Sequence, residues 1–160
     1  MGDIARNALF PFFLTRALLP KLRRAAGPVE VVFTGSLSSS LPCPRINPYG
    51  ASKAFLRQLT RGLHSDERFR AARAANVSYS YMDVGSVATA GHKFAPSLAT
   101  PAAADFAKHF VHFIGCGRAY IVPYWLHALQ MVFMHAMPEV LTTPMIFQAM
   151  AEEVEAGKKD

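Results

Sequence analysis

Apolar residues along the chain fall into segments that alternate between helical and strand periodicity. Helical patterns cover Ile4 to Arg24, Tyr49 to His64 and Ala102 to Phe113, and strand patterns cover Val29 to Thr34, Val77 to Asp83 and Arg118 to Val122. Strands that alternate with helices indicate a parallel sheet joined by right-handed crossovers. The sequence therefore predicts an α/β fold.

The chain from Tyr120 to Met150 is rich in aromatic residues and methionine. Polar residues and a proline interrupt it, so no apolar run reaches the 18 residues or so that a membrane span needs. The pattern favours an amphipathic lid, or a helix that lies on a membrane surface through residues 123–150. We divide the chain into a catalytic core, 1–122, and an apolar carboxy-terminal region, 123–160, of one partial domain.

Composition and charge narrow the class of protein. A length of 160 residues with 51% hydrophobic residues suits one domain with a sizeable core. The two cysteines, Cys43 and Cys116, form no disulfide framework, which favours a reducing compartment: the cytoplasm, or the cytosolic face of the endoplasmic reticulum membrane. The net charge is +6, but the basic residues are spread over helix faces, so we expect no nucleic-acid partner.

The chemically most informative segment is Ser36-(x12)-Tyr49-Gly50-Ala51-Ser52-Lys53. Tyr49 and Lys53 are four residues apart, so on a helix their Cβ atoms lie about 5–6 Å apart on one face. An ammonium beside a phenol favours the phenolate, which makes such a pair a general acid and base. Ser36 follows a buried strand, whose carboxyl end is where open α/β sheets bind ligands.

These residues resemble the active-site signature of the short-chain dehydrogenase/reductase family. The segment from Asn7 to Pro20 looks like the family's long helix that opens with a catalytic asparagine, here Asn7. Val84-Gly85-Ser86-Val87-Ala88-Thr89 looks like its PGxVxT loop, except that Val84 stands where the family has proline. Each residue alone has an ordinary structural explanation, but their joint order is rare. Leu41-Pro42-Cys43-Pro44 and the apolar tail look like the hydroxysteroid dehydrogenase and long-chain 3-oxoacyl-CoA reductase branch.

The glycine-rich turn that binds the dinucleotide phosphates in this family is missing from the sequence, which contains no G-x-x-x-G-x-G or G-x-G-x-x-G. The resemblance therefore covers the carboxy-terminal half of the family fold. We expect a partial Rossmann-like, doubly wound parallel sheet that lacks the amino-terminal nucleotide-binding half, and we expect this chain alone to be inactive.

The resemblance implies an oxidoreductase that interconverts a ketone and a secondary alcohol on an apolar substrate such as a steroid, fatty acyl or polyketide. It implies NADP(H) rather than NAD(H) as cofactor, with Tyr49 as proton donor, Ser36 on the carbonyl oxygen, Lys53 on the phenol and the nicotinamide ribose, and Asn7 in a water relay. Gly85, Val87 and Thr89 would bind the carboxamide side of the cofactor. It also implies a homodimer through helices 4–24 and 49–64.

Two alternatives remain open at this stage. The chain could be a truncated, inactive fragment or pseudoenzyme that acts through protein contacts, as the missing phosphate-binding turn suggests. His109, His112 and Cys116 could gather on one side of a helix and its exit, as metal ligands sometimes do, but no fourth ligand is evident and we expect no metal site.

Overall fold

A computed structural model describes residues 2–71, 75–91 and 94–156 of the chain. Its centre is a parallel sheet of three strands, β1 (Val29–Thr34), β2 (Val77–Met82) and β3 (Tyr120–Ile121), in the order β1-β2-β3. The β1 and β2 strands pair along their whole length, from Val29 opposite Val77 to Thr34 opposite Met82. The predicted α/β fold with a parallel sheet is therefore confirmed.

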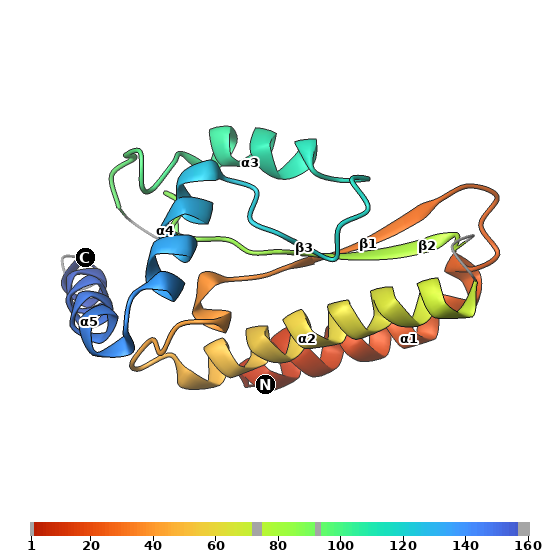
Figure 1. The fold of residues 1–160 in the computed structure, drawn as a ribbon, viewed down its shortest axis with the longest axis horizontal. Helices are drawn as coiled ribbons and strands as arrows, with labels where there is room; N and C mark the ends of the chain where they lie inside the picture. Colours follow the sequence, from red (N-terminus) through yellow and green to blue (C-terminus); the bar gives the residue numbers. More distant parts are fainter. Residues whose placement is uncertain (1, 72–74, 92–93, 157–160) are drawn as a thin grey trace.

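Helices cover both faces of the sheet (Figure 1). On one face lie α1 (Phe10–Leu22), which continues a π-helical turn η1 (Ala5–Leu9), and the longer α2 (Asn47–Arg70). On the other face lies α3 (Ala103–His112). A short 3-10 turn, η2 (Leu37–Ser39), follows β1 and leads toward the start of α2.

The principal core lies between the sheet and the α1–α2 layer. Phe33 of β1, Leu56 of α2 and Val77, Tyr79 and Tyr81 of β2 are buried together. Leucines of α1 and α2 pack against this cluster from outside. The alternation of strand side chains thus directs Tyr79 and Tyr81 toward α2, the helix that carries Tyr49 and Lys53.

The α2 helix is longer than its predicted range of Tyr49 to His64. It begins at Asn47 with a proline in its first turn, a position that suits proline because the missing N–H would have no helical partner there. Its last turns are held by Glu67, which is only 2% exposed and forms ion pairs with Arg23 and Arg70. The apolar pattern does not reveal this contact with the end of α1, so the helix end predicted from it, His64, comes before the observed end at Arg70.

The apolar carboxy-terminal region folds into two helices, α4 (Trp125–Ala136) and α5 (Glu139–Ala156). The α4 helix packs against α3 through His127, whose ring lies 5.8 Å from that of Phe106. Its later residues line a cavity with α2, so α4 connects the two helical layers. In Figure 1 α5 lies beyond it, at the far end of the molecule from β2. No helix in the described part of the chain is both long and apolar enough to cross a bilayer.

One edge of β1 is left unpaired. Within the described ranges β1 pairs only with β2, so its other edge carries backbone N–H and C=O groups that no strand contacts. Glu30 does not guard this edge, because its carboxylate accepts hydrogen bonds from the Ser80 hydroxyl and the Gly115 N–H. The open edge is therefore a surface to which another strand could add.

Candidate active site

Lys53 projects from the sheet-facing side of α2 toward the end of β1. Its side chain is buried, and Nζ donates a 2.9 Å hydrogen bond to the carbonyl oxygen of Thr34. Nζ also lies 5.5 Å from the centroid of the Tyr49 ring, one helical turn earlier. Burial lowers the pKa of Lys53, and the nearby carboxylate of Asp83 opposes this effect. The structure thus brings Tyr49 and Lys53 together as the spacing predicts.

Ser36 is held in place by its own loop. It precedes η2 with an extended backbone, and its Oγ accepts hydrogen bonds from the Ser38 N–H at 3.3 Å and the Ser38 hydroxyl at 3.0 Å. Because Oγ is the acceptor in both bonds, the hydroxyl proton of Ser36 is left to donate to another group. Only Gly35 separates Ser36 from Thr34, so this donor belongs to the same corner as Lys53.

Tyr81 positions Ser36 from below, a role that the sequence analysis missed. Its phenol oxygen accepts a 3.2 Å hydrogen bond from the Ser36 N–H. Its ring lies so close to Gly35 that a Cβ at position 35 would overlap it. Burial raises the pKa of Tyr81 to about 12, so the phenol stays neutral. The signal available in the sequence was Gly35, a glycine directly before the candidate serine Ser36.

Asn7 lies in the π-helical turn η1, where it is half-buried. The irregular turn is closed by the Phe10 N–H, which donates to the Ala5 carbonyl five residues back. Such turns are rare and occur frequently at functional sites. This turn packs against α2, but no hydrogen bond joins the Asn7 side chain to Lys53 among the described residues. A direct link between the two residues is therefore absent.

The loop that begins at Val84 is tied to the Ser36 loop. The Leu37 N–H donates to the Val84 carbonyl at 3.0 Å, and further along the Ala88 N–H donates to Pro101 at 3.0 Å. Val87 is half-buried and Thr89 is exposed. The sequence predicts functional residues in two loops, one after β1 and one after β2. These loops therefore meet at the carboxyl edge of the sheet.

His127 of α4 holds the start of the loop that begins at Val84, through a hydrogen bond with Gly85. The sequence analysis did not predict this second supporting role. The His127 ring is fully buried, Nδ1 accepts a 3.3 Å hydrogen bond from the Gly85 N–H, and Nε2 lies 3.2 Å from the Ala99 carbonyl. These partners require a neutral ring with its proton on Nε2, and burial lowers the pKa of His127 in agreement. A Cβ at position 85 would lie 2.7 Å from this ring, which explains the glycine.

Asp83 is a buried carboxyl group at the end of β2. Tyr120 donates a 2.8 Å hydrogen bond to its Oδ2, whereas Oδ1 has no hydrogen-bond partner among the described residues. Burial raises the pKa of Asp83 to about 6, although Tyr120, Arg57, His135 and Lys53 all act in the opposite direction. The Asp83 carboxyl group therefore exchanges its proton near pH 6.

We expect Asp83 to make folding stability depend on pH. Its folded-state pKa of about 6 exceeds the roughly 3.9 of an unfolded aspartate, so the folded state binds the proton more tightly. The stability that this proton contributes is complete below about pH 4 and is lost as pH rises through 6, by at most roughly 3 kcal/mol. Urea unfolding at a series of pH values should show Asp83→Asn abolishing this fall. Asp66→Asn, an exposed control, should leave it in place, and an unchanged fall in Asp83→Asn contradicts the assignment.

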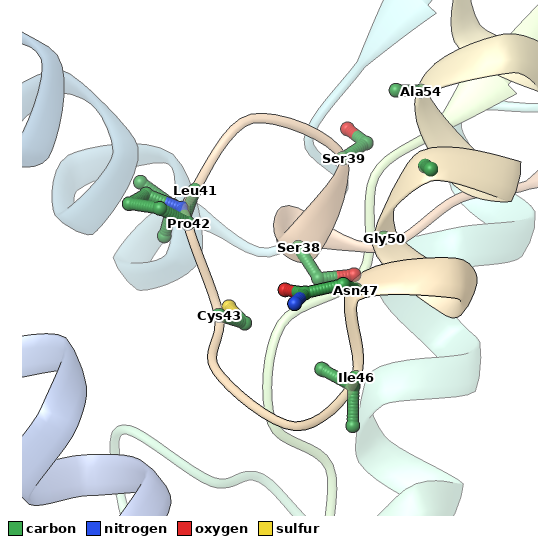
Figure 2. A pocket seen from close by; sticks show the side chains of 10 residues that line it. Ser38, Ser39, Leu41, Pro42, Cys43, Ile46, Asn47, Gly50 and Ala54 are labelled. Atoms are coloured by element: carbon green, nitrogen blue, oxygen red, sulfur yellow. The ribbon is translucent and has the colours of Figure 1, made fainter.

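A cavity of about 250 Å³ lies beside the loop that follows Ser36 (Figure 2). It is bounded by η2 and the loop after it and by the first two turns of α2. Its lining includes Ser38, Pro42, Cys43 and Asn47 but neither Ser36 nor Tyr49. This cavity therefore adjoins the candidate catalytic groups without containing them.

The histidines of α3 make aromatic contacts. His109 packs edge-on against Tyr124 at 5.4 Å, and His112 packs against Phe113 at 5.4 Å. In the part of the chain that the structure describes, no three His, Cys, Asp or Glu side chains are arranged to hold a metal ion.

A family model described as short chain dehydrogenase matches residues 3–94. The chain belongs to the short-chain dehydrogenase family. The matched range contains Asn7, Ser36, Tyr49 and Lys53, together with the loop from Val84 to Thr89. A solved short chain dehydrogenase/reductase from Burkholderia phymatum, in complex with NAD, superposes with a TM-score of 0.65 at 18% identity, over 83% of this chain and 56% of that chain. This likeness confirms a Rossmann-like short-chain dehydrogenase fold.

Of two curated relatives, one is named a reductase and the other is named inactive. Sulfoacetaldehyde reductase 2 of Chromohalobacter salexigens is 35% identical over 65 residues, which are 41% of this chain and 26% of that protein. Inactive hydroxysteroid dehydrogenase-like protein 1 of Homo sapiens is 25% identical over 129 residues, which are 80% of this chain and 38% of that protein. The chain thus spans less than half the length of these relatives.

Proposed function

We propose that this chain is the catalytic half of an NAD(P)-dependent oxidoreductase that interconverts a ketone and a secondary alcohol on an apolar substrate. The observation that carries the proposal is the corner at the end of β1. There Lys53 is buried beside the Tyr49 ring and bonded to Thr34, two residues before a serine whose hydroxyl proton is available. A carbonyl-reducing relay needs these groups together.

The residues present suit a nicotinamide nucleotide. Lys53 donates one hydrogen bond, to Thr34, among the described residues, which leaves two of its three N–H groups for acceptors such as ribose hydroxyls. The backbone from Gly85 to Thr89 is fixed at both ends by His127 and Pro101 and would face the carboxamide. When bound, the cofactor supplies or accepts the hydride.

Each side chain then has a definite task in ketone reduction. The hydroxyl of Ser36 donates to the substrate carbonyl oxygen, and Tyr49 gives that oxygen its proton. The buried ammonium of Lys53 stabilises the phenolate that remains. Asn7, in its π-helical turn against α2, acts with water to return a proton toward Lys53. In the reverse reaction the same groups accept the alcohol proton.

The substrate side is apolar. The aromatic and methionine-rich helices after β3 supply exposed Trp125, Leu129 and Phe133 on α4 and Phe147 on α5. Such a surface favours a fatty acyl, steroid or polyketide ketone over a polar one. We propose NADP(H) as the preferred cofactor.

The test is NADPH and NADH oxidation with a panel of apolar ketones. The protein is this chain joined to a dinucleotide-binding half of its family, because this sequence contains no glycine-rich phosphate-binding turn. We expect saturable turnover of the added half's own cofactor, and faster turnover with longer apolar ketones. Tight NADPH binding without turnover on any ketone would contradict the proposal.

A second candidate is an inactive protein that acts through contacts with other proteins. It is favoured by the relative named inactive, which is similar to 80% of this chain, and by Val84 in place of the family proline. This candidate predicts that NADPH oxidation in the same assay equals that of a protein with Tyr49→Phe.

We further propose that two copies associate through α1 and α2. The outer faces of these helices expose Phe10, Phe13, Leu14, Leu18 and Phe55, and Phe12 contacts Phe55 across the pair. Exposed apolar patches of this kind mark interaction surfaces. Sedimentation of a stable monomer would contradict the dimer.

A further inference from the structure

A cavity of about 610 Å³ lies between α2, β3 and α4, and none of Ser36, Tyr49 and Lys53 lines it. Its polar wall carries Arg57 and Arg61 from α2, Tyr120 from β3 and His135 from the end of α4. Arg57 and Arg61 lie eight and twelve residues after Tyr49, which corresponds to about 12 and 18 Å along the helix. The cavity therefore does not include the candidate catalytic groups, although Arg57 lies one helical turn after Lys53 and bonds to Ser40 in the loop that carries Ser36.

Positive charge in this cavity is not neutralised by a lining carboxylate. Among the residues that the structure describes, neither Arg57 nor Arg61 is ion-paired with an acidic side chain, whereas Arg23 and Arg70 both pair with Glu67. Arg57 donates to the Ser40 hydroxyl, a neutral group. The carboxylate of Asp83 interacts with Arg57 but is not among the lining groups, and its Oδ2 accepts the hydrogen bond of Tyr120, which does line the cavity.

The opposite wall is apolar. Met131 is buried there, and Val132 lines the cavity although it is 67% exposed, so part of the wall meets solvent. Val122 and Ala128 complete this side. A volume of several hundred Å³ with an apolar wall and a few convergent polar groups is typical of small-molecule sites. Guanidinium groups are suited to carboxylate and phosphate oxygens.

The position in the sheet keeps this cavity accessible in a longer protein. The cavity lies at β3, and the unpaired edge of the sheet is that of β1, on the opposite side of β2. A dinucleotide-binding half that adds strands to β1 would therefore not cover it. We propose that the cavity binds an amphipathic anion, with the carboxylate or phosphate head at Arg57 and Arg61 and a short alkyl tail along α4.

The test is calorimetric titration of the purified protein that carries this chain with decanoate, decyl phosphate, decanol and acetate. We expect decanoate or decyl phosphate to bind with micromolar affinity, and the tighter of the two identifies the head group. Decanol, which lacks the charge, and acetate, which lacks the tail, should each bind at least about tenfold more weakly.

Two exposed lining residues allow variants that should still fold. Arg61→Gln should weaken decanoate binding about tenfold or more by removing a charge-assisted contact. Val132→Asp should abolish it by placing a like charge on the apolar wall. Arg16→Gln, an exposed arginine on α1, is the matched control and should bind as the wild type does. Tyr49→Phe should also leave binding unchanged, which separates this site from the catalytic one.

Three results would overturn the proposal. Equal binding of decanol and decanoate, with no effect of Arg61→Gln, would mean that the cavity binds the alkyl chain and does not recognise the anionic head group. Equal binding of acetate and decanoate would mean an anion site without a tail. Absence of binding by both amphipathic anions below millimolar concentration would mean no site at all.

Discussion

Replacement of Tyr49 by phenylalanine is expected to lower ketone reduction by a factor of about 100 to 10,000, the usual contribution of a general acid. The variant removes only the phenol oxygen, and the ring would still pack beside Lys53. Cofactor affinity should therefore stay within a few fold of wild type. The measurement is steady-state NADPH oxidation, with binding followed separately by Trp125 fluorescence.

Two further variants help to interpret this result. Lys53→Ala should damage both turnover and cofactor affinity, because the proposal gives its ammonium two partners, the phenol of Tyr49 and the nicotinamide ribose. Tyr79→Phe is the matched control: Tyr79 lies on β2 with a buried hydroxyl that has no hydrogen-bond partner among the described residues, so its loss should leave turnover unchanged. Near-wild-type turnover in Tyr49→Phe would mean that the catalytic assignment is wrong.

The 160-residue chain expressed alone is expected to aggregate, whereas a longer protein that adds a strand to β1 should stay soluble. The reason is the unpaired edge of β1, which is long and apolar and has its acidic residue, Glu30, turned to Ser80 and Gly115. The measurement compares the soluble fraction of the two proteins expressed side by side.

A control separates the strand edge from general surface hydrophobicity. Val140 on α5 is highly exposed, and Val140→Lys reduces apolar surface far from β1. This variant should not rescue the short chain. If the short chain is soluble and unfolds cooperatively on heating, the edge of β1 is covered by some other part of the protein.

The sequence predicted the sheet because its evidence was local. The apolar run from Val29 to Thr34 becomes β1 with the same bounds, and the spacing of Tyr49 and Lys53 leads to the observed contact on α2. By contrast, β3 is shorter than the predicted Arg118 to Val122. Only two residues of β3 pair with β2. The length of such a pairing depends on both segments, so the sequence of the β3 segment alone does not predict it.

The supporting residues of the site escaped prediction for a similar reason. Tyr81 reaches Ser36 across 45 residues, and His127 reaches Gly85 across 42. Each is an ordinary aromatic side chain in its own segment, and only the fold gives it a polar partner. The π-helical turn at Asn7 was likewise invisible, since the apolar pattern of a π turn differs little from that of an α-helix over five residues.

The central claim is that Ser36 and Tyr49 act as one catalytic unit on the carbonyl oxygen. A double-mutant cycle on kcat/KM for ketone reduction tests it most directly, with Ser36→Ala, Tyr49→Phe and the double variant in the longer protein. Residues that act as a unit are strongly non-additive. We predict that Ser36→Ala alone costs about 100-fold or more and that the double variant loses less than about tenfold beyond Tyr49→Phe. Losses that multiply in full, or a Ser36→Ala variant as active as wild type, would contradict this account.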